Sequence, residues 1–520
     1  MQTHALYKLM LVAALAAAGF FPVGILAAEP PLPPGLAGPA QDEAPENTGT
    51  SSEPPLPPGL GGPAAPEAET SDAESSSGPP LPPGLSGPSE APSSEPALPP
   101  GLAPESDVTT DVDPEDTERR SFRDAFPLPI HGFWDTRAGV RIQDDPAQPR
   151  DFVLGETRLQ LQTEKAWDNV VLEYTGDFLL DGVTEEADFD LRRLRLTWSP
   201  LPSVDLRIGR QVLTWGTGDL LFINDLFPKD FQSFLSGRDE EYLKAPSDAV
   251  RVGWYNDLIN VELVYTPNFD PDRYITGERI SYYNPLRMGR SGRENQVRTR
   301  EPNSWFTHDE WALRLYRRIA SAEMAIYAYD GYWKSPAGQS LWPLPPQATF
   351  PRLRVYGASW RQPVGRGLVN VELGYYDSLK DRRGADPFTN NSELRFLIGY
   401  EREVGRNFTV GIQYYLEHML KHRNYRENQP FFIPNRDQNR HVFTTRLTKL
   451  LMNQNLTLSL FVFYSPSDQD AYFRPMANYK ITDAWMVEAG ANLFVGEDNH
   501  TFFGQLEKNS SVYAAMRYSF

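Results

Sequence analysis

The feature that most constrains this sequence is a two-residue period that recurs in segments of about ten residues from position 130 to the end. In one of them, NLTLSLFVFYS, Leu456, Leu458 and Leu460 alternate with Thr457 and Ser459. Because side chains of a strand point alternately to its two faces, this pattern predicts strands with one apolar and one polar face. A tilted strand of this length can cross a bilayer.

The connections between these segments alternate in length. Every second joint is short, as in SPLPS, YNDL and LMNQN, whereas most of the others are long and polar, the largest covering 217–245, 267–306 and 419–439. Tight turns on one side and extended loops on the other are typical of outer-membrane barrels. We therefore predict an all-β fold, a transmembrane antiparallel β-barrel of about 18 strands. The strands are expected at 130–143, 151–164, 167–180, 187–199, 203–216, 246–255, 258–266, 307–319, 320–333, 350–362, 367–378, 391–403, 407–418, 440–452, 454–465, 470–481, 484–495 and 510–520.

The alternative is a soluble all-β protein in which the many aromatic residues fill an ordinary core. Several tryptophans favour the barrel, because they fall near predicted strand ends or on outer faces, where aromatic girdles of membrane barrels lie. These are Trp134, Trp167, Trp198, Trp254, Trp311 and Trp485.

The first 120 residues differ from the rest of the chain. Residues 1–28 are expected to be a secretory signal peptide, with a short apolar run and small residues at its end. Residues 29–120 are acidic and rich in proline, and we expect a disordered periplasmic arm that precedes a barrel over 121–520. The arm holds four Leu-Pro-Pro-Gly-Leu repeats, at 32–36, 56–60, 81–85 and 98–102. The repeats are either ligands for a periplasmic protein or parts of a passive spacer.

The last strand ends in an aromatic residue. The final stretch, SSVYAAMRYSF, places Val512, Ala514, Met516, Tyr518 and Phe520 on one face. An aromatic-x-Phe ending resembles the C-terminal signal that outer-membrane barrels present to their assembly machinery. We expect this machinery and outer-membrane lipid as partners.

The alternation of side chains along each strand (its parity) predicts which residues face the interior of the barrel. If apolar residues face lipid, nine charged side chains face the lumen as the candidate pore lining: Arg137, Arg141, Arg158, Glu173, Arg193, Arg195, Arg207, Arg251 and Arg314. Two interpretations stay open: the arginines pair with acids and stiffen the wall, or they form a track that guides an anionic solute. The same parity puts Arg210 on the lipid face unless Gly209 opens a β-bulge.

The segment after the fifth predicted strand is too apolar for a solvated outer loop. Folding residues 217–245 into the lumen would cover its apolar side chains. The polar residues expected to line the remaining gap are Asp219, Asn224, Asp225, Lys229 and Asp230. The alternative is a lid packed across the outer mouth.

The same region carries a family resemblance. RIGRQVLTWGTGD, followed by IND, resembles the alginate-export family and related 18-stranded porins, in which a Gly-Arg-Gln strand precedes an inward loop. The specific match covers Arg207 to Asp225. The resemblance implies a diffusion or export channel in the bacterial outer membrane.

The sequence therefore favours an outer-membrane channel for small or polymeric hydrophilic solutes. The alternative is a barrel that acts as a sheath for a periplasmic partner such as a multihaem cytochrome, and an outer-membrane hydrolase is less favoured. The chain has no cysteine, which excludes thiolate catalysis and c-type haem attachment. We expect no enzyme activity and no cofactor. Residues 121–520 carry 51 acidic and 47 basic residues, so no basic excess suggests nucleic acid as a partner.

Overall fold

The computed structural model describes residues 129–342 and 344–520. The expected signal peptide (1–28) and the expected arm with its four repeats (29–120) lie outside the described residues.

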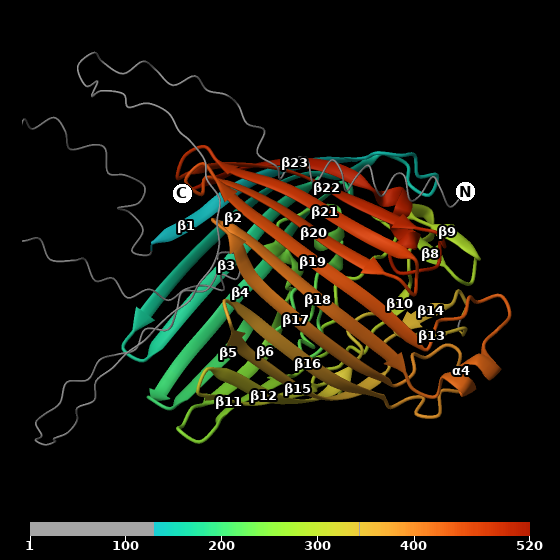
Figure 1. Ribbon diagram of the computed structural model, residues 1–520, viewed down its shortest axis with the longest axis horizontal. Helices are drawn as coiled ribbons and strands as arrows, with labels where there is room; N and C mark the ends of the chain where they lie inside the picture. The colour runs from blue at the N-terminus through green and yellow to red at the C-terminus, as the bar shows by residue number, and fades with distance from the viewer. Residues whose placement is uncertain (1–128, 343) are drawn as a thin grey trace, which may run out of the picture. The chain divides into compact units, whose positions relative to one another are not determined.

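Eighteen strands form one antiparallel sheet that closes on itself (Figure 1). Each strand pairs with the next along the chain, and the last pairs with the first. Backbone hydrogen bonds of 3.1 and 3.0 Å between Gly132 and Phe520 complete the closure. The predicted 18-stranded barrel is confirmed. Its wall consists of β1 (Ile130–Arg141), β2 (Phe152–Trp167), β3 (Val170–Asp181), β4 (Glu186–Leu201), β5 (Val204–Val212), β6 (Pro246–Trp254), β7 (Asn260–Thr266), β11 (Glu310–Ile319), β12 (Ala322–Tyr332), β15 (Arg352–Val364), β16 (Gly367–Ser378), β17 (Glu393–Gly405), β18 (Phe408–Met419), β19 (Asn439–Leu451), β20 (Leu456–Ser465), β21 (Asp470–Lys480), β22 (Trp485–Gly496) and β23 (Ser511–Ser519).

The two faces of the wall have opposite character. Outward-facing apolar residues such as Leu194, Ile326 and Ile412 are exposed, whereas the inward-facing Asp135 and Asp177 are buried. A closed sheet leaves no unpaired edge, so this wall can lie in hydrocarbon with its backbone hydrogen bonds satisfied.

Short and long connections lie at opposite ends of the barrel. Two-residue turns such as 168–169 and 202–203 join strands at one end, where the described chain also begins and finishes. Trp167 and Trp198 lie close to these turns and are about half exposed. The other end carries loops with short elements of their own: α3 (Phe231–Ser236), η1 (Glu240–Leu243), β8 (Tyr282–Asn284), β9 (Gly289–Ser291), η2 (Arg293–Asn295), β10 (Thr299–Arg300), β13 (Gly338–Ser340), β14 (Gln347–Thr349), α4 (His422–Asn428) and η3 (Gly504–Asn509). Among the described residues, no helix has both the length and the apolar character needed to cross a bilayer.

β5 ends four residues earlier than predicted. Its last residue, Val212, pairs with Pro246, the first residue of β6. Beyond Val212, β5 has no residue of β6 to pair with. The chain therefore leaves the wall at residue 213 and turns into the barrel.

A β-bulge on β4 changes the alternation of its side chains. The pairing with β3 slips between Thr175 and Gly176, opposite residues 191–193. Arg192 and Arg193 consequently both point inward. Strict alternation would have placed Arg192 on the lipid face.

Arg210 lies on the outer face, as strand parity predicts in the absence of a bulge. β5 runs past Gly209 without a register shift, and Arg210 lies opposite Asp248 on β6. The Arg210 guanidinium donates to Asp248 Oδ2 at 3.1 Å and to the Leu191 carbonyl oxygen at 2.7 Å. These contacts satisfy a charge that would otherwise be costly on this face.

Candidate functional site

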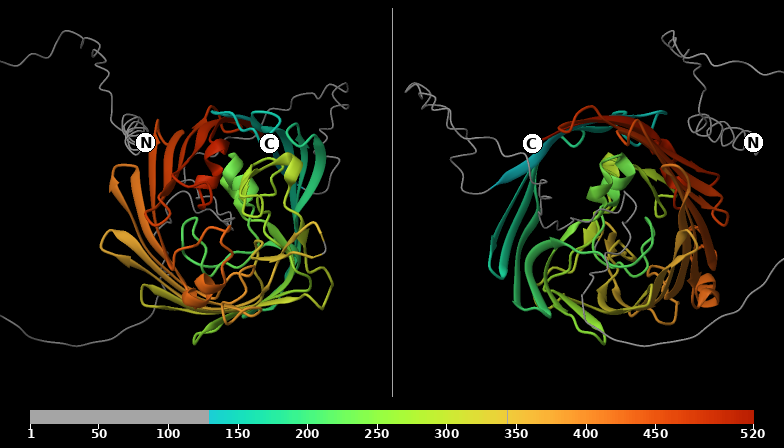
Figure 2. Two further views of the ribbon diagram at one scale, coloured as in Figure 1. Left: turned by 90° about the vertical axis from the view of Figure 1, so that its right-hand side faces the viewer. Right: turned by 60° about the vertical axis from the view of Figure 1, so that its left-hand side comes forward.

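The connection between β5 and β6, residues 213–245, folds into the barrel, and we call it the inward loop. It runs through α3 and η1 inside the ring of strands (Figure 2). Its side chains Ile223, Phe227 and Phe234 are buried in a cluster with inward-facing wall residues. The position of this apolar segment is explained by removal of its surface from water. A lid across the outer mouth is not formed by these residues.

One anchor of the inward loop is the carboxylate of Glu372 on β16, a residue that is 1% exposed. It accepts hydrogen bonds from Thr217 Oγ1 (3.0 Å), the Gly218 backbone N–H (2.8 Å) and Asn224 Nδ2 (2.8 Å), and also from the backbone N–H groups of Thr217 and Asn224. All these donors are neutral. A buried carboxylate is stable only while such donors stay in place, so Glu372 fixes the loop to this wall.

Two glycines let the loop approach the wall closely beside this anchor. Gly357 on β15 and Gly374 on β16 are neighbours in the strand pairing. A Cβ atom on Gly357 would lie 1.7 Å from Asn224 Oδ1, and one on Gly374 would lie 2.6 Å from Ile223 Cγ2. A side chain at either position would have to displace the Asn224 or Ile223 side chain of the loop.

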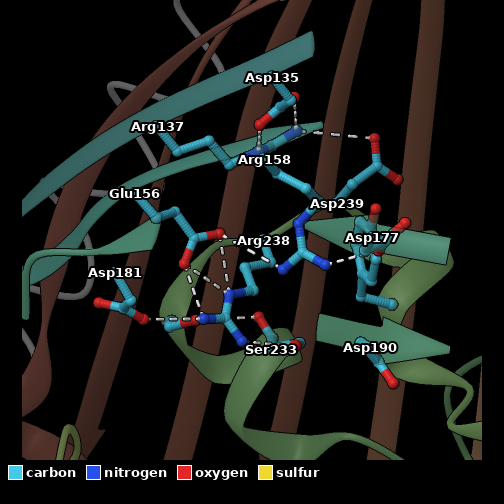
Figure 3. Close-up of polar contacts among 12 residues, drawn as sticks. Asp135, Arg137, Glu156, Arg158, Asp177, Asp181, Asp190, Ser233, Arg238 and Asp239 are labelled. Carbon is cyan, nitrogen blue, oxygen red and sulfur yellow. Dashed lines mark hydrogen bonds and ion pairs between the residues drawn. The ribbon is translucent and has the colours of Figure 1, made fainter. Parts of the chain in front are cut away.

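The far side of the loop covers an ion-pair network on β1, β2 and β3 (Figure 3). We call the network the inner cluster; its members are Asp135, Arg137, Glu156, Arg158, Asp177, Asp181 and the loop residue Arg238. Arg238 points between two carboxylates, with Nη2 at 2.7 Å from Glu156 and 3.2 Å from Asp181. No wall side chain of the cluster is more than 5% exposed. Since β1–β3 face β16 across the strand order, the loop is tied to opposite walls.

Tyr242 extends this cover to β4. The Arg158 and Arg192 guanidinium carbons lie 4.0 and 4.5 Å from the centre of its ring, so the ring contacts both cations. Burial raises the pKa of the Tyr242 hydroxyl well above its ordinary value, and the nearby arginines offset only part of this effect.

Four acidic side chains of the inward loop keep contact with water, and we call them the acidic edge: Asp219, Asp239, Glu240 and Glu241. Arg446 on β19 binds Asp219 at 2.6 Å and Glu240 at 2.9 Å. The side chains of Asp219 and Glu240 remain 30% and 39% exposed. Arg517 on β23 binds Asp239 and Glu241 in the same way, at 3.0 and 3.4 Å.

The pKa values of this edge are shifted in different directions. Burial raises the pKa of Asp219, and the attraction of Arg446 offsets only part of that rise. Burial also raises the pKa of Glu241, and neighbouring Asp239 adds to the rise. Burial opposes ionisation of Glu240 too, but Arg446 and Arg474 together lower the pKa of that carboxyl.

Five arginines on the inner faces of β4, β5, β6 and β11 form what we call the arginine arc: Arg193, Arg195, Arg207, Arg251 and Arg314. Arg193 and Arg195 both bind Glu173, at 3.2 and 2.6 Å. The side chains of Arg193 and Arg251 are 26% and 21% exposed. The inward loop contacts the arc only in part: Trp215 Nε1 donates to Glu262 at 2.9 Å, and the arginines keep more exposed side-chain area than those of the inner cluster.

Arg207 is the least compensated member of the arc. It lies directly opposite Arg251 in the β5–β6 pairing, and Arg251 is bound to Glu262 at 2.5 Å. Glu262 also lies 3.9 Å from Arg314. Within residues 129–342 and 344–520, no carboxylate lies within ion-pair distance of Arg207.

The structure divides the predicted pore-lining residues into two groups. Arg137, Arg141 and Arg158 face inward but are buried, which differs from their expected role on an open surface. Arg141 is held by carbonyl oxygens of Arg150 and Arg279. The other six, Glu173 and the five arginines of the arc, lie on neighbouring strands from β3 to β11 and stay partly exposed.

Only one of the five predicted constriction residues keeps water contact. Asp219 belongs to the acidic edge, whereas four residues are at most 5% exposed and do not line a gap: Asn224, Asp225, Lys229 and Asp230. Asp225 pairs with Lys229 at 2.9 Å, and Asp230 caps α3 by accepting from Ser233 N at 2.7 Å. These side chains hold the loop in shape, because an apolar loop needs internal partners for its buried polar groups.

Sequence reasoning did not identify Arg192 or the loop residues Arg238, Asp239, Glu240 and Glu241 as site residues. For the loop residues a sequence feature exists, since RDEE is a run of four charges inside an apolar segment. For Arg192 no such sequence feature exists, because its side chain points inward only as a result of the β-bulge on β4.

Comparisons with known proteins leave the family open. No family model and no curated protein matches the chain, so the resemblance to the alginate-export family is not confirmed. Solved structures with similarity include OccD3 (OpdP) of Pseudomonas aeruginosa, with 9% identity and a TM-score of 0.44 over 75% of this chain and 91% of that one. OccK11 (OpdR) of the same organism has 9% identity and a TM-score of 0.43, over 75% of this chain and 96% of that one. A loop-deletion mutant of OmpT, an outer membrane protein of Vibrio cholerae, has 10% identity and a TM-score of 0.35, over 76% and 99%. These values carry no argument about function, and the barrel is established by its own strand pairing.

Proposed function

We propose that this protein lies in the bacterial outer membrane and acts as a channel for small hydrophilic solutes. The closed wall, the apolar outer face and the alternation of short turns with long loops support this location. The arm in the periplasm, the assembly signal at Phe520 and a partner for the repeats belong to the same proposal.

The observation that carries the proposal is a set of water-accessible charges inside the barrel. The acidic edge belongs to the inward loop and the arginine arc to the wall of β4–β11, and both keep exposed side-chain area. A wall that served stability alone would cover its charges, as the inner cluster does. We place the solute route between the edge and the arc, with anionic groups of the solute facing the arc.

The finer alternatives are less well supported by the arrangement of charges. A polyanion such as alginate would meet four carboxylates at the acidic edge, which opposes its passage. A sheath for a multihaem cytochrome needs room in the lumen, but the inward loop crosses it and is anchored at Glu372 and through Arg238. The absence of enzyme activity stays a prediction.

Planar bilayer recording tests the proposal. Purified, refolded protein should give discrete current steps in KCl, and folding is checked by the change in gel mobility on heating. Folded protein that gives no current contradicts the channel. If protein extracted from native membranes gives no current and retains a periplasmic haem protein during purification, the sheath replaces the channel as the proposed function.

A further inference from the structure

The long-loop end of the barrel carries a basic surface that the channel does not use. It combines the loop 379–392, between β16 and β17, with the first part of the loop that contains α4. Figure 1 shows α4 beyond the long-loop ends of β17 and β18. We call this surface the basic lip; its exposed cations are Lys380, Arg382, Arg383, Lys421, Arg423 and Arg426.

The two loops of the basic lip pack into one surface. Asn424 Nδ2 donates to the Arg383 carbonyl oxygen at 2.8 Å, and Asn391 Nδ2 donates to the Leu420 carbonyl oxygen at 2.9 Å. The side chain of Tyr425 is buried beneath α4. The positions of the cations are therefore set by packed backbone.

Half of these cations have no acidic partner. Arg382 binds Asp377, Lys380 lies near Asp386, and Arg423 binds Glu427. Arg383, Lys421 and Arg426 lie within 4.0 Å of no carboxylate in the part of the chain that the structure describes. Three exposed charges without partners on one packed surface favour an anionic ligand from outside the chain.

An exposed phenylalanine lies in the same loop. Phe431 is 100% exposed, and its ring meets that of Phe432 edge to face with centres 5.5 Å apart. Basic side chains together with an exposed aromatic side chain are typical of surfaces that bind anionic lipid, because cations meet the headgroups and the ring enters the interface. Free phosphate would make no use of the ring.

The mouth of the barrel is not basic all round. The loops that join β1 to β2, β3 to β4 and β22 to β23, together with the first residue of β4, expose more acids than bases: Asp144, Asp151, Glu185, Glu186, Glu497 and Asp498 against Arg150. Net charge alone therefore does not explain the cations of the lip, which lie where β17 and β18 leave the barrel.

We infer that the basic lip binds phosphate-bearing glycolipid in the membrane leaflet that borders the long-loop end of the barrel. The lipid phosphates meet Arg383, Lys421 and Arg426, and Phe431 enters the adjoining apolar layer. This inference needs a folded barrel in a membrane but does not depend on solute passage.

Native mass spectrometry of the full chain in neutral detergent, titrated with diphosphorylated lipid A, tests the inference. The variant Arg383→Glu/Lys421→Glu/Arg426→Glu should bind at least about tenfold more weakly than the unaltered chain. A matched control, Arg366→Glu/Arg402→Glu/Arg406→Glu, makes the same change in net charge with exposed arginines at the short-turn end of the barrel and should bind within about twofold of the unaltered chain. Phe431→Ser should weaken binding by a smaller factor.

Several results would overturn the inference. One is equal affinity of the lip variant and the unaltered chain for lipid A. Another is an equal loss of affinity in the lip variant and the control. A third is that the unaltered chain binds lipid A stripped of its phosphates as tightly as diphosphorylated lipid A. Displacement of the lipid by millimolar inorganic phosphate would also overturn it, because it would mark a site for free anions. The heat-induced change in gel mobility confirms in each case that the variant is folded.

Discussion

The inner cluster and the arginine arc belong to the same wall and have similar composition, yet they differ in what covers them. In the inner cluster, the inward loop closes over the wall: Arg238 binds Glu156 and Asp181, the Tyr242 ring contacts Arg158, and almost no side-chain area of the wall residues remains exposed. In the arc, the loop supplies only Trp215, which binds Glu262, the arginines stay partly exposed, and Arg207 lacks a carboxylate partner among the described residues. The comparison shows that strand parity determines which side of the wall a charge faces, whereas the loop determines whether the charge is buried or stays accessible to water.

Removing the charge that closes the inner cluster should have the largest effect. Arg238→Ala leaves Glu156 and Asp181 buried with less compensation, and we expect a loss of about 3–5 kcal/mol in the free energy of unfolding. Guanidinium unfolding of the barrel in micelles measures it. Arg193→Ala in the arc is the control and should cost about 1 kcal/mol or less, because Arg193 is partly exposed and Glu173 keeps its ion pair with Arg195. Equal losses for the two variants would remove the distinction between the regions.

The anchor at Glu372 should show the next largest effect. In Glu372→Gln a single carbonyl oxygen replaces two acceptors, and the new amide group faces N–H donors, so we expect a loss of about 2 kcal/mol. The loop should also move more, which bilayer recordings would detect as added current noise and brief closures. Glu323→Gln, at a more exposed carboxylate that binds Arg314 at 2.8 Å, should leave both stability and noise unchanged. A quiet channel in Glu372→Gln contradicts the anchor.

Arg207 should control selectivity without controlling stability. Arg207→Gln removes an uncompensated positive charge from the arc, so the preference for chloride over potassium should fall severalfold. The reversal potential in a KCl gradient measures this preference. Arg137→Lys, which keeps a positive charge in the inner cluster, should leave the preference for chloride over potassium unchanged. The arc is not on the solute route if Arg207→Gln has the reversal potential of the unaltered protein.

The smallest effect concerns pH. Because the pKa of Asp219 is raised, this carboxylate takes up a proton at a higher pH than an ordinary aspartate as the solution is acidified. Arg446 stays charged, so the acidic edge becomes less negative and anion selectivity rises as pH falls. Asp219→Asn should lose this pH-dependent change in the reversal potential. Glu240→Gln should keep the change but move it to lower pH, because the charge of Glu240 contributes to the raised pKa of Asp219. An unchanged curve in Asp219→Asn would exclude Asp219 as its source.

Much of the fold could be predicted from the sequence, because a barrel strand records its two environments in its own alternation. The strand at 454–465 and the turns at SPLPS and YNDL were predicted from local pattern alone. The structure differs from the prediction where the pairing between strands, rather than the local sequence, determines the outcome. β5 stops at Val212 because its partner begins at Pro246, and Arg192 turns inward because β4 carries a bulge.

The candidate site was less predictable, because it depends on contacts between distant segments. Parity placed both Arg158 and Arg251 inside, but only the course of the inward loop separates the buried arginine from the water-accessible one. Asp225 and Lys229 look like gap-lining residues in the sequence, yet they pair with each other inside the loop. No local pattern contains that information.

Cysteine accessibility in the open channel tests the central claim most directly, since the chain has no cysteine of its own. Single variants Arg207→Cys and Arg251→Cys report on the arc, whereas Ser233→Cys reports on a buried position of the loop and Ala515→Cys on a buried position of the wall. A charged, water-soluble thiol reagent should reduce the single-channel current of the first pair within seconds to minutes and leave the second pair unchanged. Equal modification of all four positions, or no current from the folded protein before the reagent is added, would contradict a channel that passes along the arc.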